Sequence, residues 1–389
     1  MDGAGVLRGR IVLRDRVLDD GMIVLAGDRI REVGGYRPGA GPLVYENREA
    51  FLAPGLIDVH THGLFGLDTM DARPGGLAEM AALHLALGVT GFVASTITAS
   101  ADSLARAVQR AGADLAAVPS CLGLHLEGPY LNSANAGAQP PEWLRDPSVD
   151  EMADLYARSQ GTIRMVTLAP ERPGALELVR WLADHDIIPA IGHTSAGPED
   201  TRAALECGAR QATHLFNGMP PIRSRGPGPV PFLLQDDRVF LELIADGVHV
   251  DPSMVGWTVA MAGVDRMVLV TDSIRAAGLE DGSYDLGGHQ VTVAKGVART
   301  AGGSLAGSTL RLVDGVFNMV NFAGVDVPAA FRMATLNPAR ALRRDREMGS
   351  LEAGKQAHVI AVSPAGEVLR TWFAGRAVNP GSDAQRPSS

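Results

Sequence analysis

Histidine and carboxylate residues recur in this 389-residue chain at places where apolar runs end. The segment "GLIDVHTHG" places His60 and His62 two residues apart, so both side chains point to the same side of an extended strand. The run "CLGLHLE" ends in Glu127, and a buried glutamate is costly unless a positive group holds it. Imidazole nitrogens and carboxylate oxygens are ligands for zinc, iron and related divalent ions. These residue types therefore indicate a metal centre.

Three further residues of the same kinds follow later apolar runs. His193 lies in "GHT", His214 in "THLFN" and Asp272 in "TDS". A single histidine at a strand end is more often a hydrogen-bonded core residue than a ligand, so it is the joint occurrence that predicts the metal centre. The predicted ligands are His60, His62, Glu127, His193, His214 and Asp272.

The other histidines have simpler interpretations. His84 lies within a helical pattern, His185 near a helix end, and His289 and His358 in strand-like segments, so all four are interpreted as structural. His125 has the same strand parity as Glu127 and is expected beside the metal ligands without being one.

The elements that position these residues follow a regular alternation. Continuous apolar runs alternate with Ala- and Leu-rich helical stretches such as "ADSLARAVQRAGADLAA". The runs span residues 55–60, 88–95, 121–127, 163–168, 187–192, 211–214, 239–245 and 267–271. Strands that are apolar throughout are covered on both faces, and eight strand–helix units predict an α/β fold, a closed parallel (β/α)8 barrel. In such a barrel the carboxyl ends of the strands converge on one site.

The sequence pattern at the two ends of the chain differs from that of the barrel. The first fifty residues and the segment "QAHVIAVSPAGEVLRTWFAGRAV" contain short strands broken by Gly and Pro, and we expect them to pair in a small β-sandwich domain. The predicted division is 1–53 and 351–380 for this domain, 54–350 for the barrel, and 381–389 for a frayed polar tail.

Composition excludes several classes of partner. The net charge is −9 and no cluster of Lys and Arg would follow a phosphate backbone, which argues against nucleic acid. No apolar run reaches the ~18 residues of a membrane span, and the N-terminal sequence lacks a signal-peptide pattern, so a cytoplasmic protein is expected. Cys121 and Cys207 are far apart in apolar contexts and are expected to be free thiols.

The motifs also resemble a known family. "APGLIDVHTHG" is similar to the opening of the amidohydrolase superfamily, and "GLHLEGPYL", "GHTSA", "THLFNGMPP", "LVTDS" and "SLAGSTL" resemble the N-acetylglucosamine-6-phosphate deacetylase family. The resemblance implies one metal bound by Glu127, His193 and His214. Some family members use only that metal, whereas those that keep the first H-x-H bind a second with Glu127 bridging, so the presence of His60 and His62 allows a second site here with Asp272 as a further ligand. The expected cofactor is thus one or two divalent ions per subunit, zinc first, with iron, cobalt or manganese as alternatives.

One feature of the chain separates this branch from its relatives. Many binuclear amidohydrolases bridge their metals with a carbamylated lysine on a mid-barrel strand. Lysine does not occur before Lys295, so Glu127 is the carboxylate left for that role.

The activity that the resemblance implies is hydrolysis of N-acetyl-D-glucosamine 6-phosphate to D-glucosamine 6-phosphate and acetate, with Asp272 as general base and then general acid. An amidohydrolase acting on another N-acyl amino sugar, for example N-acetylgalactosamine 6-phosphate, or on another small amide is the alternative within the same class. A metal-binding scaffold without catalysis is the alternative from another class, since fold alone does not confer activity.

Substrate recognition departs from the family pattern at one position. The segment "ANAGAQPP" places Gln139 where the family has a histidine, and an amide keeps a hydrogen-bond donor but cannot become cationic. The resemblance implies phosphate binding by Arg225 and His249, with Arg223 as an alternative, and a homodimer in which His249 reaches a neighbouring site. The expected substrate-binding residues are Ala138, Gln139, Asn217, Gly218, Arg225, His249, Leu305, Ala306 and Gly307.

Overall fold

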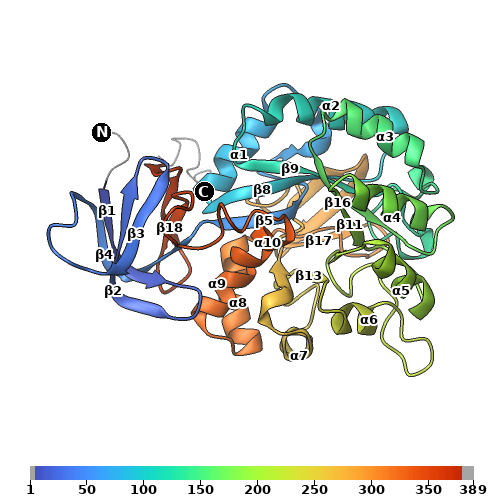
Figure 1. The fold of residues 1–389 in the computed structure, drawn as a ribbon. Coiled ribbons are helices and arrows are strands. Elements are labelled where there is room, and N and C mark those ends of the chain that lie inside the picture. The colour runs from blue at the N-terminus through green and yellow to red at the C-terminus, as the bar shows by residue number, and fades with distance from the viewer. Residues whose placement is uncertain (1–4, 379–389) are drawn as a thin grey trace.

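The computed structural model describes residues 5–378, so the expected polar tail at 381–389 lies outside the described residues. Eight parallel strands form the central sheet of the larger part of the molecule (Figure 1). They are β5 (Leu56–Thr61), β8 (Val89–Thr96), β9 (Cys121–Glu127), β10 (Ile163–Leu168), β11 (Ile188–Ile191), β12 (Gln211–Ala212), β13 (Phe240–Leu243) and β14 (Met267–Leu269). Each predicted run therefore overlaps a strand, which confirms the (β/α)8 prediction.

The strands follow chain order around the sheet, and its two edges approach each other. Every neighbouring pair from β5 to β14 is parallel. At the carboxyl end of β5, the backbone N–H of Asp272 donates to the carbonyl of His60 at 2.9 Å, and Thr61 and Ser273 form a single parallel bridge. The barrel is nearly closed, and its first and last strands bring residues 60 and 272 together.

Helices cover the outer face of the barrel, as its uniformly apolar strands require. Every residue of β8 and β9 is buried. The main core contains Phe92 and Leu124 from these strands together with Leu104, Val108 and Leu178 from helices. The helices are α1 (Gly76–Ala86), α2 (Ala101–Leu115), α3 (Val149–Arg158), α4 (Ala175–Asp184), α5 (Pro198–Cys207), α6 (Val230–Gln235), α7 (Pro252–Ala262), α8 (Leu312–Ala323), α9 (Val327–Met333) and α10 (Leu336–Ala341).

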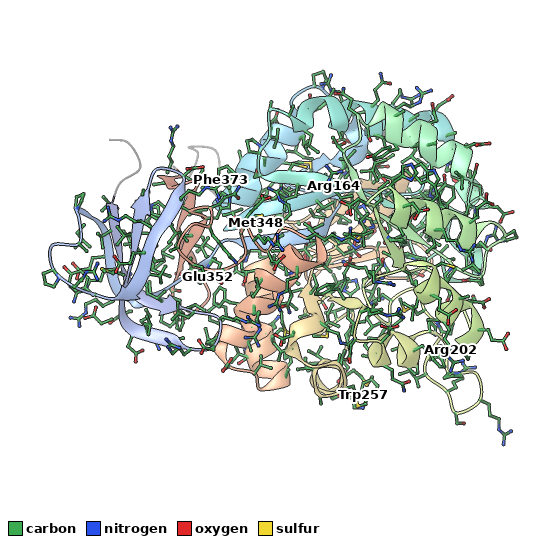
Figure 2. All side chains as sticks on the ribbon, in the orientation of Figure 1. Arg164, Arg202, Trp257, Met348, Glu352 and Phe373 are labelled. Carbon is green, nitrogen blue, oxygen red and sulfur yellow. The ribbon has the colours of Figure 1, made fainter. Side chains whose placement is uncertain are left out.

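The two ends of the chain meet in a second, smaller sheet at one side of the barrel (Figure 1). Its seven strands run in the order β20-β19-β18-β4-β1-β2-β3, so strands from both ends pair directly. They are β1 (Gly5–Val12), β2 (Val17–Ala26), β3 (Arg29–Gly35), β4 (Leu43–Pro54), β18 (Val359–Val362), β19 (Val368–Phe373) and β20 (Arg376–Ala377). Met348, labelled in Figure 2, lies where the chain returns from the barrel and packs against Ile57 and Val93 of the barrel strands.

Two small antiparallel sheets lie at the carboxyl end of the barrel. An antiparallel sheet of β15 (Gly282–Leu286), β16 (His289–Ala294) and β17 (Val297–Thr300) packs through Leu286 and Val291 on Ile97 and Ile274. A two-stranded hairpin, β6 (Gly63–Leu64) with β7 (Leu67–Asp68), follows β5. Within residues 5–378, no helix combines the length and apolarity needed to cross a membrane.

Candidate metal centre

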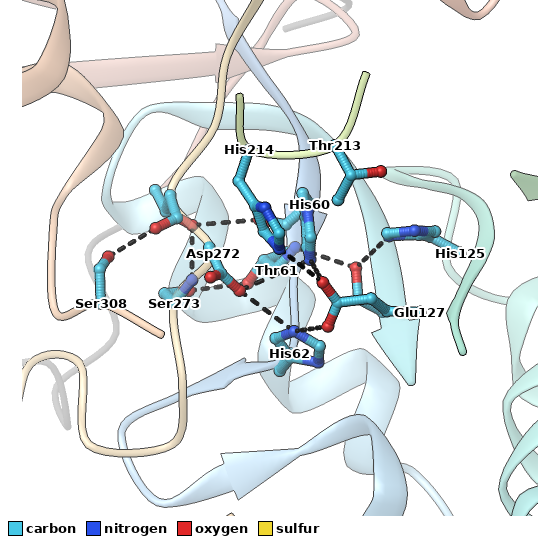
Figure 3. Close-up of polar contacts among 12 residues, drawn as sticks. His60, Thr61, His62, His125, Glu127, Thr213, His214, Asp272, Ser273 and Ser308 are labelled. Atoms are coloured by element: carbon cyan, nitrogen blue, oxygen red, sulfur yellow. Dashed lines mark hydrogen bonds and ion pairs between the residues drawn. The ribbon is translucent and has the colours of Figure 1, made fainter. Parts of the chain in front are cut away.

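The predicted ligands converge at the carboxyl end of the barrel. His60 belongs to β5 and Glu127 ends β9, while His193, His214 and Asp272 lie two or three residues beyond β11, β12 and β14. All five side chains are 8% exposed or less. A cavity of about 290 Å³ opens above them, and Glu127 and Asp272 both line it. Figure 3 shows His60, His62 and His214 facing Glu127 and Asp272.

Glu127 lies at the centre of the cluster, and its two oxygens face different groups. Oε1 lies 3.2 Å from Nε2 of His193 and 2.9 Å from Nε2 of His214. Oε2 lies 3.3 Å from Nε2 of His62. Two triads therefore share this glutamate, one with His193 and His214 and the other with His60 and His62, each with its ligand atoms close enough for one ion.

The hydrogen bonds on the far side of two imidazoles show why the cluster needs a cation. Nδ1 of His193 lies 2.8 Å from the carbonyl oxygen of Asn135, and Nδ1 of His60 lies 3.0 Å from a carboxylate oxygen of Glu242. Both oxygens can only accept, so each Nδ1 carries a proton, and each ring, when it is neutral, presents the lone pair of its Nε2 to Glu127. Nε2 of His60 is buried without a hydrogen-bond partner. Lone pairs that face a carboxylate in a buried site fit a divalent ion.

Asp272 adds a second carboxylate on the side of His60 and His62. Its Oδ1 lies 3.1 Å from Nε2 of His62 and 3.5 Å from Nε2 of His60. Burial disfavours a charged His62, yet its hydrogen bonds with Asp272 and Glu127 raise its pKa to about 9. The carboxylates of Glu127 and Asp272 therefore favour positive charge beside His62, which either a bound metal ion or a protonated histidine supplies.

Three of the converging residues have strained backbones. His193, His214 and Asp272 have φ values of +46°, +26° and +49°, in the left-handed region that residues other than glycine rarely adopt. Such conformations cost about 1–3 kcal/mol each and concentrate at functional sites. The strand predicted at 211–214 is shorter in the structure, because β12 ends at Ala212. The chain turns after Ala212, and the turn brings Nε2 of His214 to 2.9 Å from Oε1 of Glu127.

Gln139 also contacts the central glutamate. Its amide nitrogen donates to Oε2 of Glu127 at 2.5 Å, and its amide oxygen accepts from the backbone N–H of Thr98 at 2.8 Å. Gln139 is 4% exposed and lines the cavity. The residue that departs from the family pattern thus fixes the orientation of Glu127 and leaves its second amide hydrogen uncommitted.

The residues expected to bind the phosphate separate into two groups. His249 lines the cavity of its own chain, whereas the resemblance implied a reach into a neighbouring subunit, and its Nδ1 lies 2.7 Å from Oδ2 of Asp246. Asn217 and Gly218 line the cavity as well. Arg223 and Arg225 are exposed on the loop at 221–226 and do not line it.

The remaining predicted residues are close to the cavity. Leu305 and Gly307 line it with Ala138, and Ala306 is wholly buried just behind. Gly307 has φ +58°, and a Cβ there would meet the backbone oxygen of Asp272 at 2.8 Å, so only glycine fits. Four apolar residues that were not predicted also line the cavity: Ile97, Phe216, Ile274 and Leu286.

The histidines interpreted as structural have structural surroundings. His125 contacts Ser95 at 3.0 Å and Thr167 at 2.8 Å, so both ring nitrogens are engaged. Burial lowers the pKa of His84 to about 3 and, with less effect from nearby arginines, that of His358 to about 4. Cys121 and Cys207 are free thiols.

Taken together, an α/β barrel with histidines and carboxylates at the carboxyl ends of its strands defines a hydrolase of the metal-dependent barrel class. The Amidohydrolase family pattern matches residues 51–378. N-acetylglucosamine-6-phosphate deacetylase of Vibrio furnissii is 41% identical over 84% of this chain and 82% of its own length. N-acetylgalactosamine-6-phosphate deacetylase of Escherichia coli O157:H7 is 40% identical over 95% of this chain and 98% of its own.

A solved structure is similar over nearly the whole chain. It is a mutant N-acetyl-D-glucosamine-6-phosphate deacetylase from Mycobacterium smegmatis in complex with N-acetyl-D-glucosamine-6-phosphate. It has 36% sequence identity and a TM-score of 0.92, covering 96% of this chain and 99% of the other. The chain belongs to the amidohydrolase family, in the branch of the N-acetylglucosamine-6-phosphate deacetylases. This confirms the resemblance expected from the sequence motifs.

Proposed function

We propose that the protein hydrolyses N-acetyl-D-glucosamine 6-phosphate to D-glucosamine 6-phosphate and acetate. The observation that carries the proposal is the pair of triads sharing Glu127, with the Asp272 carboxylate beside them at the floor of one cavity. Similarity to deacetylases of this type over most of the chain supports the substrate.

The residues fit one or two divalent ions, and we propose zinc. Glu127, His193 and His214 would hold the first, and His60, His62 and Asp272, with Glu127 shared, would hold the second. A divalent ion bound here would polarise the amide carbonyl of the substrate and lower the pKa of a bound water.

Asp272 is the proposed general base and acid. Its carboxylate would take a proton from the attacking water as the oxygen bonds to the acetyl carbon. The proton would then pass to the sugar nitrogen as the C–N bond breaks, leaving acetate and a free amine. Asp272 is suited to this exchange because its carboxylate lines the cavity, with Oδ1 3.1 Å from Nε2 of His62. The free amide hydrogen of Gln139 would donate to the carbonyl oxygen of the substrate, since the other is used by Glu127.

The phosphate is proposed to bind between His249, Asn217 and the backbone of Gly218, with a guanidinium from Arg225. Arg225 lies outside the cavity of its own chain, so a homodimer in which its exposed loop reaches the neighbouring site would supply it. Trp257 and Met261 are exposed on α7, which follows His249 in the chain, and Figure 2 shows Trp257 at the outer edge of the molecule.

The galactosamine epimer is the second candidate substrate. The E. coli O157:H7 relative named for N-acetylgalactosamine 6-phosphate aligns with 95% of this chain. Steady-state kinetics with the two phosphorylated epimers separates the candidates. A kcat/KM higher for the glucosamine derivative supports the leading proposal, and the reverse order supports the second.

A further inference from the structure

Glu242 is a wholly buried carboxylate that the proposed reaction does not use. It lies on β13 and is 0% exposed. Its Oε2 lies 3.0 Å from Nδ1 of His60 and 3.2 Å from the backbone nitrogen of His214, and its Oε1 accepts from Gln211 at 2.7 Å. Within the part of the chain described by the structure, its ion-pair partner is His60.

This contact distinguishes His60 from the other metal-facing histidines. Nδ1 of His193 faces a backbone carbonyl, and Nδ1 of His62 and of His214 have no hydrogen-bond partner. His60 is therefore the member of the cluster whose outer nitrogen meets a carboxylate. A carboxylate in that position fixes the ring tautomer, holds the ring orientation and makes the inner nitrogen a stronger ligand.

The inner nitrogen of His60 points at the second triad. Nε2 lies 3.5 Å from Oε1 of Glu127 and 3.5 Å from Oδ1 of Asp272, with no hydrogen bond of its own. Gln211 donates to Oε1 of Glu242 while His60 contacts Oε2, so the carboxylate cannot turn away without leaving an amide unpaired.

We propose that Glu242 is a positioning residue that sets the affinity of the metal position formed by His60, His62 and Asp272. The position formed by Glu127, His193 and His214 would depend on it much less, because Glu242 meets His214 at its backbone and not at its ring. The inference rests on the two-metal centre of the proposed function but not on the sugar substrate.

The test is a Co²⁺ titration of the full chain after chelation, followed by visible absorption and by metal content after dialysis. The wild-type protein should bind two ions. Glu242→Gln, which keeps the shape but removes the charge, should weaken the second ion by about 10–100-fold and leave the first within about threefold. Unchanged affinity for both ions, equal weakening of both, or a wild-type chain that binds a single ion would each overturn the proposal.

Asp58→Asn is the matched control. Asp58 is also 0% exposed, and it accepts from the backbone nitrogen of His60 at 3.3 Å and from the backbone and hydroxyl of Thr271 at 3.2 and 2.6 Å, so it contacts no ligand ring. Asp58→Asn should keep both cobalt affinities near those of the wild type. If it weakens the second ion as much as Glu242→Gln does, loss of any buried charge explains the result and the proposal fails.

A second variant covers the case in which Glu242→Gln does not fold. Gln211→Leu keeps the Glu242 charge but removes the group that holds its other oxygen, so it should weaken the second ion in the same direction by a smaller factor. No change in Gln211→Leu would then contradict the proposal. Two bound ions without acetate release would reject the substrate and leave the role of Glu242 standing, so the two failures are distinguishable.

Discussion

Asp272 is the residue on which the proposed chemistry depends most. Its carboxylate lies 3.1 Å from His62 and lines the cavity, and its backbone is held from both sides by His60 and Ser308. Figure 3 shows Ser308 and Ser273 around it. Asp272→Asn keeps the size and one oxygen but removes the proton acceptor. We expect kcat to fall by about 10²–10⁴-fold, measured as acetate release under saturating substrate.

The control for this prediction is metal content. Asp272→Asn should retain the ion at Glu127, His193 and His214, because Asp272 does not belong to that triad. A variant that keeps this ion and also keeps wild-type kcat would show that Asp272 is not the base.

The hydrogen bond from Gln139 to Glu127 supports a second prediction. Gln139→Ala removes the donor to Glu127 and the proposed donor to the substrate, so kcat/KM should fall by about 10²–10³-fold. Gln139→His restores a ring N–H and should recover most of that loss. Equal kcat/KM in the wild type and both variants would show that the position carries no donor role.

The predictability of site residues depended on where they lie along the strands. The six ligand candidates lie at the ends of apolar runs, where a histidine or carboxylate is easily recognised because it interrupts the apolar pattern. Glu242 lies inside the run "VFLELIA", and its single carboxylate among apolar residues was the signal that could have revealed it. Its partner His60 is 182 residues away in the chain, so that contact follows only from barrel closure.

At the scale of elements, the strands were predictable and the turns after them were not. Apolar runs mark the eight strands because both faces of each are covered. The left-handed backbone at His193, His214 and Asp272 has no signal in the residue types, since glycine is what normally marks such a conformation. Those turns decide where the ligands point, so the metal centre could be predicted by its members but not by its geometry.

Helix α1 and strand β8 carry a prediction on pH. His84 of α1 is 3% exposed and stacks on Phe92 of β8, with ring centroids 4.4 Å apart. Burial lowers the pKa of His84 to about 3, so the unfolded chain takes up a proton near pH 6.5 that the folded chain refuses. The free energy of unfolding therefore decreases as the pH falls from 6.5 toward 3, because only the unfolded chain binds a proton at His84 in that range.

His84→Phe should remove that contribution to the pH dependence. Between pH 7.5 and 5.5 the free energy of unfolding of the wild type should fall by about 1.4 kcal/mol more than that of the variant. Urea unfolding of both proteins at both pH values checks this, and any metal effect cancels in the difference. Parallel losses in the two proteins would mean that His84 is protonated in the folded state.

At the scale of the whole molecule, the chain ends meet in one sheet although more than 300 residues separate β4 from β18. Similar strand texture at both ends predicted this meeting, but the strand order could not be read from the sequence, because β1 pairs with both β2 and β4. Away from that sheet, Arg223 and Arg225 are exposed on the 221–226 loop.

A shared site between two subunits predicts complementation. Arg225→Ala should weaken binding of the phosphorylated sugar while unphosphorylated N-acetylglucosamine is affected little. Mixed dimers of Arg225→Ala and Asp272→Asn chains should regain activity, because one site in each then combines an intact Asp272 with an arginine from the other chain. Mixtures as inactive as the separate variants would place Arg225 in the site of its own chain.

Acetate release by the purified protein reports directly on the proposed hydrolysis. N-acetyl-D-glucosamine 6-phosphate and unphosphorylated N-acetyl-D-glucosamine are supplied in parallel, and metal content is measured on the same sample. The predicted result is turnover of the phosphorylated sugar at a much higher kcat/KM, with one or two ions per chain, and loss of that turnover on chelation. A fully metal-loaded protein that releases acetate from neither sugar would contradict the proposed function.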